Sequence, residues 1–210
     1  MSRTLRAVGR AVPFALFGMF LIAYCFGEPG KVIVDNDRVL VREVAWDQQS
    51  SSHPHEHDTL TICLTCASGK SGTAKFEAKG TTHGDEKPVD GKPATSVVIE
   101  LKDHMVPPLA NKTGYQNAFP RPGSVKVFEN AHIVVWDYHW TPGKPSPMHF
   151  HDKDVVVVYL DNGALKSTTP DGKSTINEVS FGLTKFNARD RTHTEEVVRG
   201  NARAVMMELK

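Results

Sequence analysis

The 210-residue sequence has little net charge and lacks several common catalytic and nucleotide-binding motifs. Its 25 lysines and arginines nearly balance its 24 acidic residues, for a formal charge of +1. Nucleic-acid-binding domains usually carry a basic patch or stripe, so this balance argues against a nucleic-acid partner. The sequence also has no G-x-S-x-G elbow, no Walker loop and no G-x-G-x-x-G segment after a strand. The enzyme classes built on these motifs are therefore excluded.

Sustained helical periodicity is also missing after the first 30 residues. Short β-rich runs broken by turn residues occupy this part of the chain, at 39–44, 59–65, 73–78 and 96–101. Many short strands at such spacing are typical of an all-β barrel or sandwich. We therefore expect an all-β protein.

The one long apolar run lies at the start of the chain. Arg3, Arg6 and Arg10 precede an uncharged apolar segment at 11–27. A positive region followed by an apolar region is the pattern of an export signal. We expect residues 1–27 to be a signal peptide or an N-terminal anchor. The protein would then be periplasmic or secreted, or held at a membrane by residues 11–27, although this run is short for a full span.

Cysteine is scarce, and two of the three cysteines follow the apolar segment. Cys63 and Cys66 form a C-x-x-C pair, which in an exported chain is compatible with a disulfide. Residues three apart on a regular strand face opposite sides, however. A disulfide and two separate buried thiols therefore both remain open.

A proline-rich connector divides the β-rich sequence into two parts. Residues 105–123 contain Pro107, Pro108, Pro120 and Pro122. Proline is incompatible with a helix interior and with a central strand. We therefore predict a linker or an arm packed on the outside, between one domain at 31–104 and another at 124–210.

The second part repeats the pattern of the first. Residues 34–46 match 128–140 at a separation of 94, and the same separation, continued without a gap, places His55 and His57 on His149 and His151. Further on, a separation of 110 places His83 on His193. These matches predict an internal duplication.

Two histidines open the longest run of β-branched residues in the second part. His149 and His151 precede Val155 to Val158. Because side chains alternate faces along a strand, both histidines are expected to point the same way. Two imidazoles converging from one strand form half of a metal site.

These residues resemble the two sequence motifs of the cupin superfamily, here in a two-domain bicupin form. Gly143, His149-x-His151 and Gly163 follow the first motif, and Gly182 and His193 follow the second. The resemblance implies two tandem antiparallel β-barrels of the jelly-roll type. It further implies that His149, His151 and His193 hold a metal in the second barrel, and that His55, His57 and His83 do so in the first.

The sequence departs from the family pattern where a glutamate ligand is expected. Val155 stands at this position in the second part, and Thr61 in the first. Three neutral imidazoles suit divalent Zn, Fe, Mn, Ni or Cu. Without the carboxylate the ion keeps its full charge, which favours a small anionic ligand or substrate. Thiol dioxygenases are similar cupins that also use three histidines.

Two functions from different classes follow. The first is an exported bicupin that uses its metal as an oxidoreductase, dioxygenase-like, or as a hydrolase on a small anionic molecule. The second is a cupin that has lost its metal and either binds a small ligand without catalysis or forms a structural homo-oligomer. The three-histidine pattern motivates the first, and the missing glutamate motivates the second.

Overall fold

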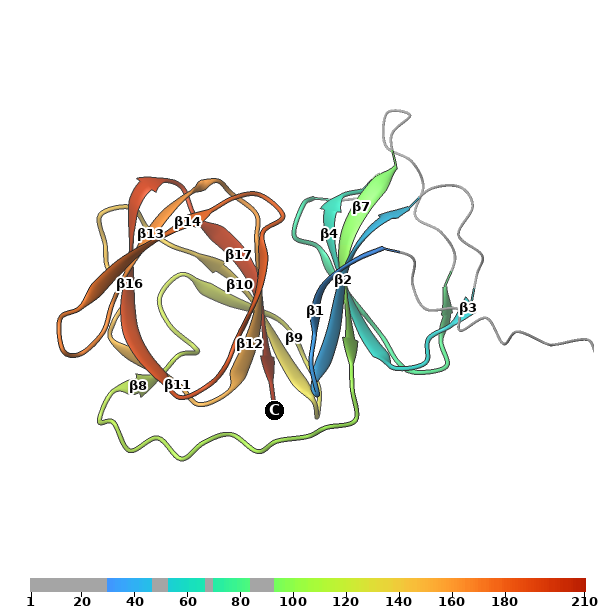
Figure 1. Cartoon of the computed structure of the whole chain (residues 1–210), viewed down its shortest axis with the longest axis horizontal. Helices are drawn as coiled ribbons and strands as arrows, with labels where there is room; N and C mark the ends of the chain where they lie inside the picture. Colours follow the sequence, from blue (N-terminus) through green and yellow to red (C-terminus); the bar gives the residue numbers. More distant parts are fainter. Residues whose placement is uncertain (1–29, 47–52, 67–69, 84–92) are drawn as a thin grey trace, which may run out of the picture.

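The computed structural model describes residues 30–46, 53–66, 70–83 and 93–210. These residues form strands, turns and loops, with no helix among them, which confirms the all-β prediction. Accordingly, no helix in this part of the chain is long and apolar enough to cross a membrane. The predicted export segment, residues 1–27, lies outside the described residues. Two β-rich halves lie side by side (Figure 1).

The first half is built on one five-stranded antiparallel sheet. In spatial order it contains β1 (Lys31–Asp35), β2 (Val39–Trp46), β7 (Ala94–Leu101), β4 (Asp58–Thr65) and β5 (Ala74–Glu77). A separate two-stranded ladder pairs β3 (His53–Pro54) with β6 (Thr82–His83).

The second half contains two five-stranded sheets, which enclose a barrel (Figure 1). One sheet has the order β15 (Thr184–Asn187), β12 (Asp154–Tyr159), β17 (Arg203–Leu209), β10 (Ile133–His139) and β9 (Ser124–Glu129). The other has the order β14 (Ser174–Val179), β13 (Gly163–Thr168), β16 (Arg191–Gly200), β11 (His149–His151) and β8 (Gln116–Asn117).

Strand alternation divides the buried side chains between two cores. Along β12, Val156 and Val158 face the first half, whereas Val155 and Val157 face the barrel interior. The first of these cores also takes residues from β2, β4 and β7, so sheets from both halves pack against each other. Because each half buries an apolar sheet face on the other, the hydrophobic effect stabilises the pair as one body.

The proline-rich connector contributes to the second barrel. Its strand β8 pairs in parallel with β11, opposite His149 and Phe150. Ala118, Phe119 and Arg121 are buried, and the ring of Phe119 stacks on that of Trp136 at 5.1 Å. The prediction of an arm packed on the outside is therefore wrong for Ala118, Phe119 and Arg121. The prediction was based on the prolines alone, whereas the packing is decided by the side chains beside them.

The two cysteines form a disulfide, which settles the alternative left open by the sequence. The pairing of β4 with β7 is irregular between Cys63 and Thr65, and Cys66 lies beyond the end of the strand. Because the strand is interrupted here, the regular alternation of faces does not separate the two sulfur atoms.

Ion pairs join the two halves in a reciprocal way. Arg38 of the first half pairs with Asp154 of the second, and both side chains are only 9% exposed. His132 of the second half lies against Asp58 of the first at 3.3 Å, with side chains 46% and 24% exposed. Arg38 and His132 come directly before the matching strands β2 and β10, and Asp58 and Asp154 begin the matching strands β4 and β12. Of these two contacts, only the one between Arg38 and Asp154 is buried.

Candidate metal centre

Three histidine rings meet inside the second barrel. The pairing of β11 with β16 places His149 directly opposite His193, and His151 follows two residues later on the same face. One nitrogen from each ring lies within 4.8 Å of the others, and all three residues are buried. The structure thus brings together the three histidines predicted for the second barrel.

The orientation of the rings fits a shared ion. His149 Nδ1 lies 2.8 Å from the carbonyl oxygen of Pro147, which can only accept, so this Nδ1 carries the proton and Nε2 is unprotonated. The Nε2 atoms of His151 and His193 are 3.2 Å apart. Two nitrogens at this separation could both ligate one ion, because a zinc–nitrogen bond is about 2.1 Å long. The three residues therefore fit a divalent metal.

Burial keeps these ligands neutral. It lowers the pKa of His149 to about 2, aided by the positive charge of Arg121. Burial also holds the pKa of His151 well below its usual value, with Arg191 adding to the effect. The pKa of His193 is lowered by burial as well, against an opposing influence from Glu195. Since metals bind the neutral imidazole, the centre is prepared for a cation near neutral pH.

A buried arginine adjoins the three rings. Arg121 Nη1 lies 2.6 Å from His149 Nε2, and the guanidinium packs against the rings of Phe119 and Tyr138. Its Nη2 is 3.6 Å from a carboxylate oxygen of Glu195. The single lone pair of His149 Nε2 serves either Arg121 or a metal, but not both at once.

Two connected cavities lead to the histidines. The inner one, of about 20 Å³, is bounded by Arg121, His151 and His193 among others. The outer one, of about 170 Å³, adds Ser167, Asn177 and Lys185. The cavities share five lining residues: Tyr159, Asn187, Arg191, His193 and Glu195. The site is therefore a narrow pocket with a polar mouth.

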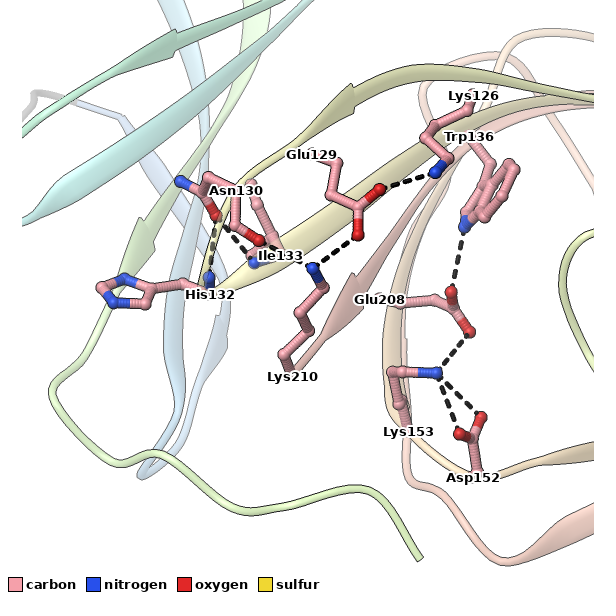
Figure 2. A network of polar contacts seen from close by, with 10 residues as sticks. All are labelled: Lys126, Glu129, Asn130, His132, Ile133, Trp136, Asp152, Lys153, Glu208 and Lys210. Carbon is pink, nitrogen blue, oxygen red and sulfur yellow. Dashed lines mark hydrogen bonds and ion pairs between the residues drawn. The ribbon is translucent and has the colours of Figure 1, made fainter.

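A carboxylate does lie near the position of the missing glutamate, but on the next strand. Val155 pairs directly with Glu208 of β17, whose side chain is buried. Trp136 Nε1 donates to Glu208 at 2.9 Å, and Lys153 Nζ lies 3.8 Å away (Figure 2). Lys153 also binds Asp152 (Figure 2). Glu208 is not part of the cluster of metal-ligating atoms among the described residues.

The first-half histidines have different surroundings. His55 is buried, with Nδ1 3.4 Å from the Thr59 hydroxyl and Nε2 3.6 Å from the Glu77 carboxylate. His57 is half-buried, and the side chain of His83 lies outside the described part of the structure. The convergence of His55, His57 and His83 therefore stays a prediction.

Backbone pairing changes which first-half residues correspond to the metal centre. His83 pairs with His53, as His193 pairs with His149. The carbonyl of His55 accepts from Gly80 N, as that of His151 accepts from Asp190 N.

By these contacts, His53 and His55 occupy the positions of His149 and His151. The separation is 96 here instead of 94, because the second half has two more residues between Trp140 and His149 than the first half has between the matching Trp46 and His53. The same shift moves the position of the missing glutamate from Thr61 to Thr59, since Thr59 pairs with Glu100 as Val155 pairs with Glu208.

Comparison with known proteins identifies the fold. No family model matches the chain, and no curated protein has a significantly similar sequence. Solved structures do match. A cupin 2 conserved barrel domain protein from Leptotrichia buccalis is 17% identical, with a TM-score of 0.51, covering 87% of this chain and 88% of its own. The chain has a cupin fold.

Two further structures with this fold match most of the chain. AerE from Microcystis aeruginosa is 13% identical, with a TM-score of 0.54, covering 86% of this chain and 97% of its own. Salicylate 1,2-dioxygenase from Pseudoaminobacter salicylatoxidans, in adducts with gentisate, is 9% identical, with a TM-score of 0.57, covering 82% and 68%. At these identities the matches establish the cupin fold and leave activity open.

Three charged residues of the pocket were not predicted from the sequence. Arg191 and Glu195 lie two residues before and after His193 on β16, and both line the two cavities. Strand alternation around His193 could have identified them. Arg121 had no comparable signal, because it lies in the proline-rich connector.

Proposed function

We propose that this protein is a cupin that binds one divalent metal through His149, His151 and His193 and acts on a small anionic molecule. The observation that carries the proposal is the convergence of three buried, neutral imidazoles, two of which, His151 and His193, line a cavity. A site with three protein ligands leaves coordination positions for other groups, as catalytic metal sites do.

The chemistry divides between the metal and the chain. A bound divalent ion would supply a Lewis acid or redox centre, and Zn, Fe, Mn, Ni and Cu all suit imidazole ligands. The Pro147 carbonyl fixes the tautomer of His149 and so directs its Nε2 into the site. The aromatic residues of the barrel core, including Trp136, Tyr138 and Trp140, exclude water around it.

The charge of the pocket supports an anionic substrate. Among the described residues that line the two cavities, Arg121, Arg191 and Lys185 are cationic and Glu195 is acidic. A divalent ion on three neutral ligands would add to this positive potential. Because the inner cavity is only about 20 Å³, the substrate is expected to be small.

Proteins with the same fold include a dioxygenase and a metal-containing decarboxylase. The salicylate dioxygenase is described with gentisate, and a matching Bacillus subtilis oxalate decarboxylase is described with Mn(II) centres. The latter has a TM-score of 0.50 at 10% identity, so it supports the proposal through its fold alone. We therefore place a dioxygenase-like reaction ahead of hydrolysis.

The test is a screen of the purified protein loaded separately with Fe(II), Mn(II), Ni(II), Cu(II) and Zn(II). Oxygen uptake and hydrolysis are measured with small carboxylic acids and phenolic acids, beside a His149→Ala/His151→Ala control. We expect turnover with at least one metal that the double variant lacks. Silence with every metal, or equal turnover in the double variant, would refute the enzyme proposal.

A second candidate is a metal-free cupin that only binds a ligand. The contact between Arg121 Nη1 and His149 Nε2 favours it, because the guanidinium uses the lone pair that a metal needs. Elemental analysis of protein purified from its native host separates the two candidates. About one equivalent of metal per chain supports the enzyme, and its absence after growth in metal-replete medium supports the binding protein.

We also propose export and internal duplication. Arg3, Arg6 and Arg10 before the apolar segment support export, and the Cys63–Cys66 disulfide is compatible with an oxidising compartment. The matched pairings of β3 with β6 and of β11 with β16 support duplication. Cell fractionation and N-terminal sequencing of the mature protein test export. An intact N-terminus in the cytosol would refute it.

A further inference from the structure

Arg121 is the buried charge whose hydrogen bonding is least complete in the pocket. Its side chain is 0% exposed, yet two of its three nitrogens, Nε and Nη2, have no hydrogen-bond partner. The third nitrogen, Nη1, contacts His149 Nε2 and, at 3.4 Å, the carbonyl oxygen of Ala118. A buried cation with unmet donors is costly, so this arrangement calls for an acceptor.

The two unpaired nitrogens lie on one edge of the guanidinium. Nη2 is the terminal nitrogen trans to Cδ, so its N–H and that of Nε point in parallel directions. This edge matches the two oxygens of a carboxylate, which arginine binds through two parallel hydrogen bonds. The rings of Phe119 and Tyr138 lie 4.6 and 4.2 Å from the central carbon of the guanidinium and hold it in place.

No protein carboxylate completes this edge among the described residues. Glu195 comes nearest, with an oxygen 3.6 Å from Nη2, but that distance is too long for a hydrogen bond. Glu195 is itself hydrogen-bonded to Trp140 Nε1 at 3.2 Å, which holds it to the side. The inner cavity is lined by Arg121, His151 and His193, so a ligand there lies beside the arginine and two of the three histidines.

We propose that Arg121 binds the carboxylate group of a small carboxylic acid through its Nε and Nη2 edge, beside the three histidines. This inference rests on the proposed function, because it names the carboxylic acid as the class of substrate. The carboxylate enters the inner cavity, and the remainder of the molecule lies in the outer cavity against Ser167, Asn177 and Lys185. A neutral analogue of the same shape leaves the guanidinium uncompensated and is rejected.

The proposal also links the ligand to the metal. Arg121 places a positive charge beside His149 and occupies its lone pair, so it opposes metal binding. A carboxylate on the guanidinium neutralises that charge. The carboxylate and the metal therefore strengthen each other's binding, and by linkage the effect is reciprocal.

Acetate and its neutral isostere acetamide test the proposal on the full chain, first without metal and then with Zn(II). Binding is followed by NMR chemical-shift titration. We expect saturable binding of acetate and none of acetamide. Arg121→Met weakens acetate binding by about tenfold to a hundredfold, since two charge-assisted hydrogen bonds are lost. Arg121→Lys also weakens it by at least about tenfold, because an ammonium lacks the two parallel donors.

Arg199→Met is the matched control, because it removes the same charge from an exposed ion pair with Glu178, whose side chains are both 67% exposed. It should leave acetate binding unchanged. If Arg121→Met does not fold, Arg121→Lys carries the test. Equal acetate affinity in wild type and the Arg121 variants, or no acetate binding to wild type in either metal state, overturns the proposal.

Metal affinity gives a second readout that does not depend on turnover. We expect Arg121→Met to bind Zn(II) about tenfold more tightly than wild type, and to lose most of the coupling between acetate and Zn(II). Unchanged coupling would mean that acetate acts on the metal alone and would overturn the role of Arg121. Failure of the proposed enzyme activity would leave the acetate titration of the metal-free protein unaffected, so the two outcomes are distinguishable.

Discussion

The two halves of the chain place different side chains at matching positions of the same strand pairings. Arg42 on β2 and Glu100 on β7 form an ion pair in the first half. In the second half the corresponding residues are Trp136 on β10 and Glu208 on β17, joined by a hydrogen bond from the indole. The second half thus replaces a charged pair by an aromatic residue and a buried acid.

The same contrast appears next to the histidines. In the first half Glu77 lies 3.6 Å from His55, whereas Asn187 stands at the position of Glu77 in the second half. Asparagine is neutral, so no carboxylate stands at this position to pair with His151. One strand framework can thus hold either a histidine beside a carboxylate or a trio of neutral histidines, depending on a few inward residues.

Removal of the metal ligands should produce the largest difference between the halves. His149→Ala/His151→Ala is expected to weaken binding of Zn(II) or Co(II) by more than about 100-fold, because even the loss of a supporting contact costs roughly 10–100-fold. Isothermal titration calorimetry and elemental analysis measure this effect. His53→Ala/His55→Ala is the matched variant, because these residues occupy the positions of His149 and His151, and it should leave the tight site intact. An equal loss in both variants would show that the halves do not differ in this respect.

The reciprocal ion pairs between the halves should also differ in strength. Asp154→Asn breaks a buried pair with Arg38 and should lower the free energy of unfolding by about 3 kcal/mol, because it leaves a buried charge unpaired. Asp58→Asn breaks the more exposed contact with His132 and should cost less than about 1 kcal/mol.

Urea unfolding of both variants measures these costs. Asparagine keeps the Oδ1 atom that accepts from Arg189 N in one case and from Lys79 N in the other, so the comparison isolates the ion pairs. A larger cost for Asp58→Asn would contradict the assignment of the buried pair as the stronger link.

The smallest expected effect concerns the two matching acids, Glu208 and Glu100. Burial raises the pKa of Glu208 above its ordinary value of 4.5, so the folded state holds this proton more tightly than the unfolded state. That contribution to stability is complete below pH 4.5 and is lost as the pH rises through the folded pKa. Glutamine does not ionise, so Glu208→Gln avoids this loss of stability. The free energy of unfolding of the variant, relative to that of wild type, should therefore rise between pH 4 and pH 8.

Glu100→Gln should behave in the opposite way at neutral pH, because it breaks the ion pair with Arg42. Chemical unfolding across the pH range compares both variants with wild type. A loss of stability of Glu208→Gln relative to wild type as the pH rises would mean that the fold stabilises Glu208 as an anion. Glu208 would then not differ from the ion-paired Glu100 in this respect.

Local sequence pattern accounts for part of this structure. The period of two places His149 and His151 on one face, and the turn residues with short β-rich runs predict the all-β class. Resemblance to the cupin motifs added His193, which the structure places beside the other two histidines, and the jelly-roll architecture, which the structure confirms. These features follow from short stretches of chain, whose side-chain direction is fixed by the backbone of the strand itself.

Other features depend on how distant strands meet. The two-residue shift that pairs His53 with His83 depends on loop length and on hydrogen bonds between strands, which an ungapped sequence match does not register. Arg121 reaches the pocket because Ala118 and Phe119 bury the connector in the barrel. The sequence by itself determined which faces the histidines share. Only the tertiary structure decided what lies opposite them, because packing between remote segments is not encoded in any local period.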